Sequence, residues 1–223
     1  MDTGTPQHVK EHHVHQRHFD RLVMLSDGVF AIALTLSAVE LRPEALPGQT
    51  VVQVWGKPLA VYFLSFFLIG IVWMRHRRTL AHLYRVDTPI TLMSLLLLSL
   101  VALVPVFVRV LLEGLSDSAA NGMLIYSLSL VAIYLCLAAG WFYAAFIRHL
   151  APSVPRVRAW GWLMEDFFVA MFFAGTALYS LQMHMLALLM ALAGSAMRIG
   201  VTVFEKKAKA QEAQADGHAD SQH

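Results

Sequence analysis

The chain has 223 residues, of which 57% are hydrophobic and only 14% are charged. Soluble domains carry about 25% charged residues, so this composition excludes an ordinary soluble globular protein. The net charge of +2 is too small to indicate nucleic-acid binding. No phosphate loop, dinucleotide fingerprint, zinc-protease motif or nucleophile elbow points to an enzyme. We therefore expect an integral membrane protein that is not an enzyme and has no cofactor or structural metal.

Residues 1–20 form a polar tail that is rich in histidine, with His8, His12, His13, His15 and His18. Histidine tracts can bind transition metals, so the sequence leaves open a non-conducting membrane protein that senses metal through this tail. Nothing in the tail fixes a ligand geometry, and we favour a flexible cytoplasmic tail without a metal. At the other end, residues 205–223 are polar and rich in Ala, Gln and Asp, which predicts a disordered tail.

Residues 21–41 form the first apolar segment, which is unusual because it carries Asp27 near its start. As a helix these residues reach about 31 Å, the thickness of a bilayer's hydrocarbon core. On a helical wheel Asp27 points about 140° away from an apolar stripe. That stripe consists of Gly28, Ile32, Leu36 and Val39, with Thr35 at its edge.

A charged side chain at membrane depth costs at least about 2.5 kcal/mol when it is unpaired, so Asp27 needs a partner. In the alternative, Ser26 and Asp27 merely cap a helix that starts there. The helix would then comprise residues 26–41 only, which makes it shorter than the roughly 17 residues that a span requires. The longer helix, with Asp27 inside it, fits better.

Further apolar segments follow at about residues 51–74, 89–112 and 122–147. Pro105 should kink the second of these or leave a carbonyl oxygen free for a neighbour. The last stretch, residues 160–204, is too long for one crossing, so we divide it into two helices that meet near residues 182–184. This division places Glu165 and Asp166 in the first turns of the fifth helix, where the helix dipole favours acids. The sequence thus predicts an all-α membrane domain of six transmembrane helices over residues 21–204.

The basic residues are distributed unevenly among the segments that connect the predicted spans. Most of the 17 lysines and arginines lie before the first span, between the second and third, between the fourth and fifth, or after the last. Cytoplasmic loops carry an excess of Lys and Arg, so we expect both termini in the cytoplasm and an even number of spans.

The motif around Asp27 resembles that of the bacterial transmembrane protein 175 potassium channels, relatives of a lysosomal potassium channel. Their first helix carries Arg-x-x-x-Phe-Ser-Asp followed by a Gly-Val-Phe-Ala-Ile type run. Here Arg21 precedes Leu25-Ser26-Asp27 and then Gly28-Val29-Phe30-Ala31-Ile32, so leucine replaces the motif phenylalanine. The second helix of that family typically carries a tryptophan followed three residues later by a histidine, which Trp73 and His76 match.

The resemblance implies a leak-type, potassium-permeable channel in the bacterial inner membrane, with K⁺ as the permeant ion. Its partners are three further copies of itself in a homotetramer, in which the first helix of each subunit lines the pore. Carried over by position, the pore lining comprises the narrow hydrophobic constriction at Ile32, the hydroxyl of Thr35, and Leu36 and Val39. A polar lock would hold this helix through Arg21, Ser26, Asp27, Trp73 and His76.

Two other interpretations stay open. An aliphatic stripe is common in membrane helices and can serve helix packing or lipid contact alone. A proton-coupled secondary transporter could use a relay of Asp27, His76, Glu165 and Asp166. Transporters usually contain two similar halves with broken helices, and the sequence shows no such internal repeat.

Overall fold

The computed structural model describes the backbone of residues 6–41, 47–116 and 120–220 and the side chains of residues 19–41, 47–114 and 121–202. In these ranges the secondary structure consists of helices and turns, without a strand. Six segments are long and apolar enough to cross a membrane, namely Phe19–Val39, Val51–Ala81, Thr88–Gly114, Asn121–Ile147, Arg156–Ser180 and His184–Thr202. The predicted all-α fold with six membrane-spanning helices is confirmed.

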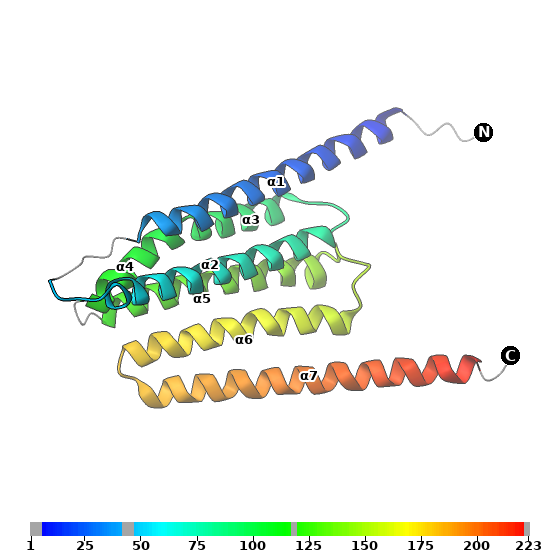
Figure 1. Cartoon of the computed structure of the whole chain (residues 1–223). Helices are drawn as coiled ribbons and strands as arrows, with labels where there is room; N and C mark the ends of the chain where they lie inside the picture. Colours follow the sequence, from blue (N-terminus) through cyan, green and yellow to red (C-terminus); the bar gives the residue numbers. More distant parts are fainter. Residues whose placement is uncertain (1–5, 42–46, 117–119, 221–223) are drawn as a thin grey trace, which may run out of the picture.

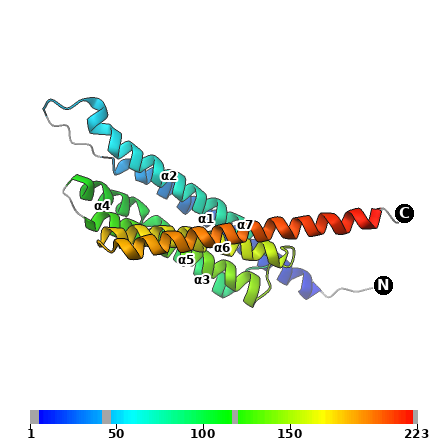
Figure 2. The ribbon, with the colours of Figure 1, turned by 90° about the horizontal axis from the view of Figure 1, so that it is seen from below.

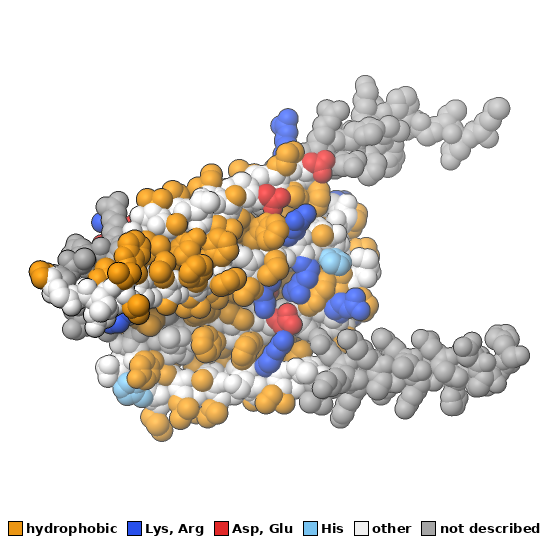
Figure 3. Space-filling view, viewed as in Figure 1, with side chains coloured by type: hydrophobic (Ala, Val, Ile, Leu, Met, Phe, Trp, Pro, Cys, Tyr) orange, Lys and Arg blue, Asp and Glu red, His pale blue; other side chains and the backbone are white. Residues whose placement is uncertain are grey.

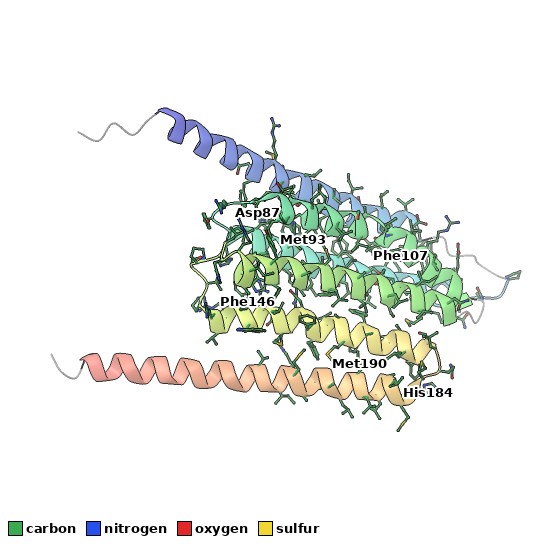
Figure 4. The ribbon with its side chains drawn as sticks, turned by 180° about the vertical axis from the view of Figure 1, so that it is seen from behind. Asp87, Met93, Phe107, Phe146, His184 and Met190 are labelled. Atoms are coloured by element: carbon green, nitrogen blue, oxygen red, sulfur yellow. The ribbon has the colours of Figure 1, made fainter. Side chains whose placement is uncertain are left out.

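The elements are, in chain order, α1 (Pro6–Val39), α2 (Val51–Ala81), α3 (Thr88–Ala102), α4 (Val104–Ser116), α5 (Ala120–Phe142), the π-helical turn η1 (Tyr143–Ile147), α6 (Arg156–Ser180) and α7 (His184–Asp220). Helices α1 to α5 form one bundle, and the hairpin of α6 and α7 lies along α5 (Figure 1). The start of α1 and the end of α7 project from the same end of the bundle (Figures 1 and 2). Asp87 and Phe146 lie near that end and His184 lies at the opposite one (Figure 4).

The first and last helices extend beyond the predicted membrane domain. The backbone of α1 is helical from Pro6, and that of α7 continues to Asp220, where the sequence predicts disorder from residue 205 onward. The side chains of the histidine tract, from His8 to His18, lie outside the described part of the chain. The division of the chain into two tails and a membrane domain between them therefore stays a prediction.

Local sequence signals explain where several helices begin and break. Thr50 caps α2 through a reciprocal capping box, and the Asp87 carboxylate caps α3 by accepting a hydrogen bond of 3.1 Å from the backbone N–H three residues later. The third span is interrupted at Leu103, between α3 and α4. Pro105 explains the break because it lacks a backbone N–H and its ring clashes with the preceding turn. The interruption lies next to Pro105, where the sequence predicts a disturbance of the helix.

The hairpin between α6 and α7 agrees with the predicted boundary near residues 182–184, where Gln182 has a positive φ of 63°. Helix α6, however, begins at Arg156, so Glu165 and Asp166 lie in its third turn. The prediction that these two acids occupy the first turns, where they would interact with the helix dipole, is wrong. Arginine side chains surround them instead.

Helix α5 is central to the buried core, since it packs against α3, α4 and α6. Its Tyr134 and Trp141 are among the largest fully buried side chains. The indole N–H of Trp141 donates a hydrogen bond of 2.9 Å to the carbonyl oxygen of Ala159, which satisfies its polar group. Helix α1 contributes Phe30 and Ala33 to the core. It is thus anchored to its own subunit along one face.

The contact between α4 and α5 depends on Gly122. A Cβ atom at this position would lie 2.6 Å from the backbone carbonyl oxygen of Val110. We therefore expect Gly122→Ala to lower the free energy of unfolding by about 1–3 kcal/mol, because the two helices must move apart. Thermal unfolding in detergent measures this change.

Gly140 provides the matched control on the same helix, because a Cβ atom there would meet nothing within 4 Å. Gly140→Ala should be neutral or slightly stabilising, since alanine favours helix more than glycine does. Equal melting temperatures for the two variants would contradict the close approach of α4 and α5.

Candidate functional site

Helix α1 has two different faces. The face toward its own subunit is buried, and Phe30 and Ser37 are at most 1% exposed. The predicted stripe is uncovered, with exposed fractions of 58% for Ile32, 46% for Leu36 and 59% for Val39. Hydrophobic side chains cover the central part of the face that α1 and α2 form, whereas charged side chains gather toward the end from which both termini project (Figure 3). The stripe is therefore free to contact lipid, another subunit or a pore.

Thr35 is the polar residue at the edge of the stripe. Its hydroxyl lies 3.0 Å from the carbonyl oxygens of both Ala31 and Ile32, to which it donates its hydrogen. Because the hydrogen is used within the helix, the exposed hydroxyl oxygen is left as an acceptor. An oxygen of this kind can contact a cation or a water molecule.

Four side chains form a polar cluster between α1 and α2, namely Ser26, Asp27, Trp73 and His76. The first pair of this cluster joins the two helices through an aspartate. The indole N–H of Trp73 on α2 donates a hydrogen bond of 2.7 Å to Oδ1 of Asp27 on α1. The guanidinium of Arg77 lies 5.3 Å from the centre of the Trp73 ring, on the same helix. A hydrogen bond to a charged acceptor is among the strong ones, so this contact holds α1 against α2.

The second pair is more deeply buried. Ser26 is 2% exposed and His76 is 5% exposed. The Ser26 hydroxyl donates its hydrogen to the carbonyl oxygen of Leu22 at 2.8 Å, and its oxygen lies 3.2 Å from Nε2 of His76. Since the only hydroxyl hydrogen is used, we infer that His76 carries its proton on Nε2 and donates to Ser26. This geometry fixes the orientation of the ring.

The structure thus brings Ser26, Asp27, Trp73 and His76 together, as the sequence predicts, but leaves Arg21 apart. The Arg21 side chain is exposed, and no hydrogen bond or ion pair joins it to the described residues.

A second polar cluster was not predicted. We call it the ionic bridge, because it joins α2 to the α6–α7 hairpin, and it comprises Arg75, Arg78, Glu165, Asp166 and Arg198. Asp166 pairs with Arg75, and Glu165 lies 3.0 Å from Arg198 and 3.8 Å from Arg78. Arg78 also lies 4.1 Å over the ring of Trp162 on α6. No local sequence motif marks this cluster, since it depends on which helices become neighbours.

The residues of the hypothetical proton relay are divided between these two clusters. Asp27 and His76 belong to the contact between α1 and α2, whereas both acids of α6 face arginines. In the described part of the chain, no group of three or more His, Cys, Asp and Glu side chains is placed to hold a metal ion.

Comparisons with known proteins point to one family. The model of the family described as endosomal/lysosomal potassium channel TMEM175 matches residues 21–105, which include the four residues of the polar cluster. A bacterial protein named as a potassium channel, from Streptomyces collinus, is 34% identical over 146 residues, which cover 62% of this chain and 69% of that protein. A second one, from Chamaesiphon minutus, is 32% identical over 145 residues, which cover 61% of this chain and 71% of that protein.

The fold gives the same result. The chain is similar to the crystal structure of a lysosomal potassium-selective channel TMEM175 homolog from Chamaesiphon minutus, with a TM-score of 0.60 and 26% identity. The match covers 80% of this chain and 98% of that one. The resemblance that the Ser26-Asp27 motif indicates is therefore confirmed. The chain belongs to the family of the endosomal/lysosomal potassium channel TMEM175, a family of multi-pass membrane proteins that are ion channels rather than enzymes.

Proposed function

We propose that this protein is a leak-type, potassium-permeable channel of the bacterial inner membrane, in which four copies bring their α1 helices together around one pore. One observation carries the proposal: α1 buries one face in its own subunit and leaves the Ile32 stripe uncovered. The related bacterial proteins are named as potassium channels, which supports K⁺ as the permeant ion. No cofactor is part of the proposal.

The pore lining we propose follows from the order of residues along this stripe. Ile32 forms the narrowest ring, Thr35 adds a ring of hydroxyl oxygens, and Leu36 and Val39 continue the lining outward. A ring of aliphatic side chains excludes ions because water leaves a narrow apolar constriction. Small rotations of α1 would widen the ring and let water return.

The polar cluster acts, in this proposal, as a lock on the rotation of α1. Asp27 lies about 140° from Ile32 around the helix, so the two side chains face nearly opposite directions. Holding Asp27 on Trp73 and Ser26 on His76 therefore keeps the Ile32 stripe turned away from α2. The sequence also assigns Arg21 to this lock, and its side chain forms no hydrogen bond or ion pair with the described residues.

We also propose the orientation and the division of the chain. Both termini lie in the cytoplasm, since α1 and α7 project from the same end and the connections near that end carry most of the basic residues. The membrane domain of residues 21–204 lies between a histidine-rich tail, residues 1–20, and a second cytoplasmic segment, residues 205–223. The lipid bilayer is the only other partner that we assign. We assign no nucleic-acid partner.

A proton-coupled transporter is not favoured. Such a relay needs groups that exchange protons along a path, whereas Glu165 and Asp166 are engaged with three arginines. Both acids thus already have ion-pair partners within the chain and lie apart from Asp27 and His76, which belong to the contact between α1 and α2. The two acids serve the ionic bridge better than a relay.

The proposal is tested by K⁺ efflux from liposomes that contain the purified protein, with valinomycin defining complete release. We expect efflux down the K⁺ gradient without a proton gradient, and a particle of four 24.9 kDa chains by native mass spectrometry. Efflux that requires a proton gradient and disappears in Asp27→Asn would favour the transporter. The absence of any efflux, or a monomeric particle, would contradict the channel.

A further inference from the structure

Arg75 occupies a special place on α2. It follows Trp73 by two residues and directly precedes His76, the two residues of α2 that contact α1. Its own side chain points to a different neighbour, Asp166 on α6, with which it forms an ion pair and a hydrogen bond. One short segment of α2 therefore holds α1 on one side and α6 on the other.

Both members of this ion pair are shielded. The side chain of Arg75 is 18% exposed and that of Asp166 is 6% exposed. The guanidinium also lies 5.6 Å from the centre of the Tyr134 ring on α5, within the range of a cation–π contact. A shielded arginine with these contacts has little freedom to move, so it fixes the backbone from which it projects.

The side chains of the ionic bridge are the principal tie between α2 and α6. Helix α6 packs mainly on α5 and α7, and α2 packs mainly on α1. Glu165 extends the tie to α7 through its ion pair with Arg198, whose two atoms lie 3.0 Å apart.

We propose that Arg75 is a positioning residue: its ion pair with Asp166 ties the α2 segment that contacts the pore helix to the α6–α7 hairpin. The pore part of this statement rests on the proposed function, in which α1 lines the pore. The tie itself rests on contacts within one subunit. When the ion pair is lost, the α2 segment can shift and its hydrogen bonds to α1 weaken.

The test replaces both partners with apolar residues of similar length, as Arg75→Met with Asp166→Leu. Replacing both members of a buried ion pair leaves no unpaired charge, so the double variant should fold. We then introduce Trp73→Phe, which removes the donor to Asp27, in the native chain and in this background. If Arg75 positions Trp73, the loss of melting temperature caused by Trp73→Phe falls by at least half in the double variant.

K⁺ efflux supplies the second readout, which a merely stabilising ion pair would leave unchanged. We expect the folded double variant to pass K⁺ at least threefold faster than the native protein, because α1 is held less firmly. The matched control is the ion pair of Arg109 and Glu113, 2.9 Å apart on α4. Arg109→Met with Glu113→Leu should keep native efflux and the full effect of Trp73→Phe.

Each outcome decides one statement. If Trp73→Phe lowers the melting temperature equally in the native chain and in the double variant, Arg75 does not position Trp73 and the inference is wrong. If even the native protein passes no K⁺, the proposed function fails, while the comparison of melting temperatures still decides the inference. Should the double variant not fold, the same comparison is made in Asp166→Asn, which keeps an oxygen acceptor for Arg75.

Discussion

Replacing Ile32 with asparagine should raise K⁺ efflux from liposomes by about tenfold or more. Asparagine is similar in size to isoleucine but carries an amide, so the proposed constriction would become polar without becoming much wider. A polar ring holds water, and an ion then crosses it without losing its hydration. A tenfold increase corresponds to lowering the barrier by about 1.4 kcal/mol, which the four amides of the proposed tetramer can readily supply.

Leu189 on α7 provides the matched control for this experiment. Its side chain is 58% exposed, as is that of Ile32. Leu189→Asn therefore places the same amide on an equally exposed position, five residues from the start of α7. We expect its efflux to equal that of the native protein. An equal increase in both variants would mean that the amide perturbs the membrane domain generally, and that Ile32 does not face a pore.

Most of the fold follows from the sequence because each span carries its own signal. Length and hydropathy define the six segments, and Pro105 predicts the break at Leu103, since proline removes a backbone hydrogen bond wherever it stands in a helix. These are local effects, which need no knowledge of neighbouring helices. The beginning of α6 was placed less well, because apolar residues and arginines alternate around residues 156–160 without a capping residue.

The two polar clusters show where sequence reasoning succeeds and where it stops. The contact between Asp27 and Trp73 could be predicted, because both residues belong to motifs that the sequence displays. The ion pair of Arg75 and Asp166 joins residues 91 positions apart, and Arg75 reads in the sequence as one of several interfacial arginines. Only the ion pair with Asp166 on α6 distinguishes it from its neighbour Arg77. The missing information was the spatial order of the helices.

The contact between Trp73 and Asp27 should contribute substantially to stability. Trp73→Phe keeps an aromatic ring in place but removes the N–H that donates to Asp27 at 2.7 Å. Hydrogen bonds to charged groups contribute about 1.5–3 kcal/mol, and here the carboxylate is left half-buried without this donor. We expect the free energy of unfolding to fall by about 2.5 kcal/mol and the melting temperature to fall by roughly 5–10 °C. K⁺ efflux should rise as well, since α1 is freed to rotate.

Trp55 gives the control on the same helix, because it is 41% exposed and lies at the other end of α2. Trp55→Phe should change the free energy of unfolding by less than about 1 kcal/mol, as surface substitutions usually do. Combining Trp73→Phe with Asp27→Leu completes a double-mutant cycle. If the hydrogen bond accounts for the loss, the two changes couple by about 2 kcal/mol, since the double variant leaves no charge without its donor. Additive effects would mean that Trp73 stabilises α2 by ring packing alone, and that Asp27 is held by another group.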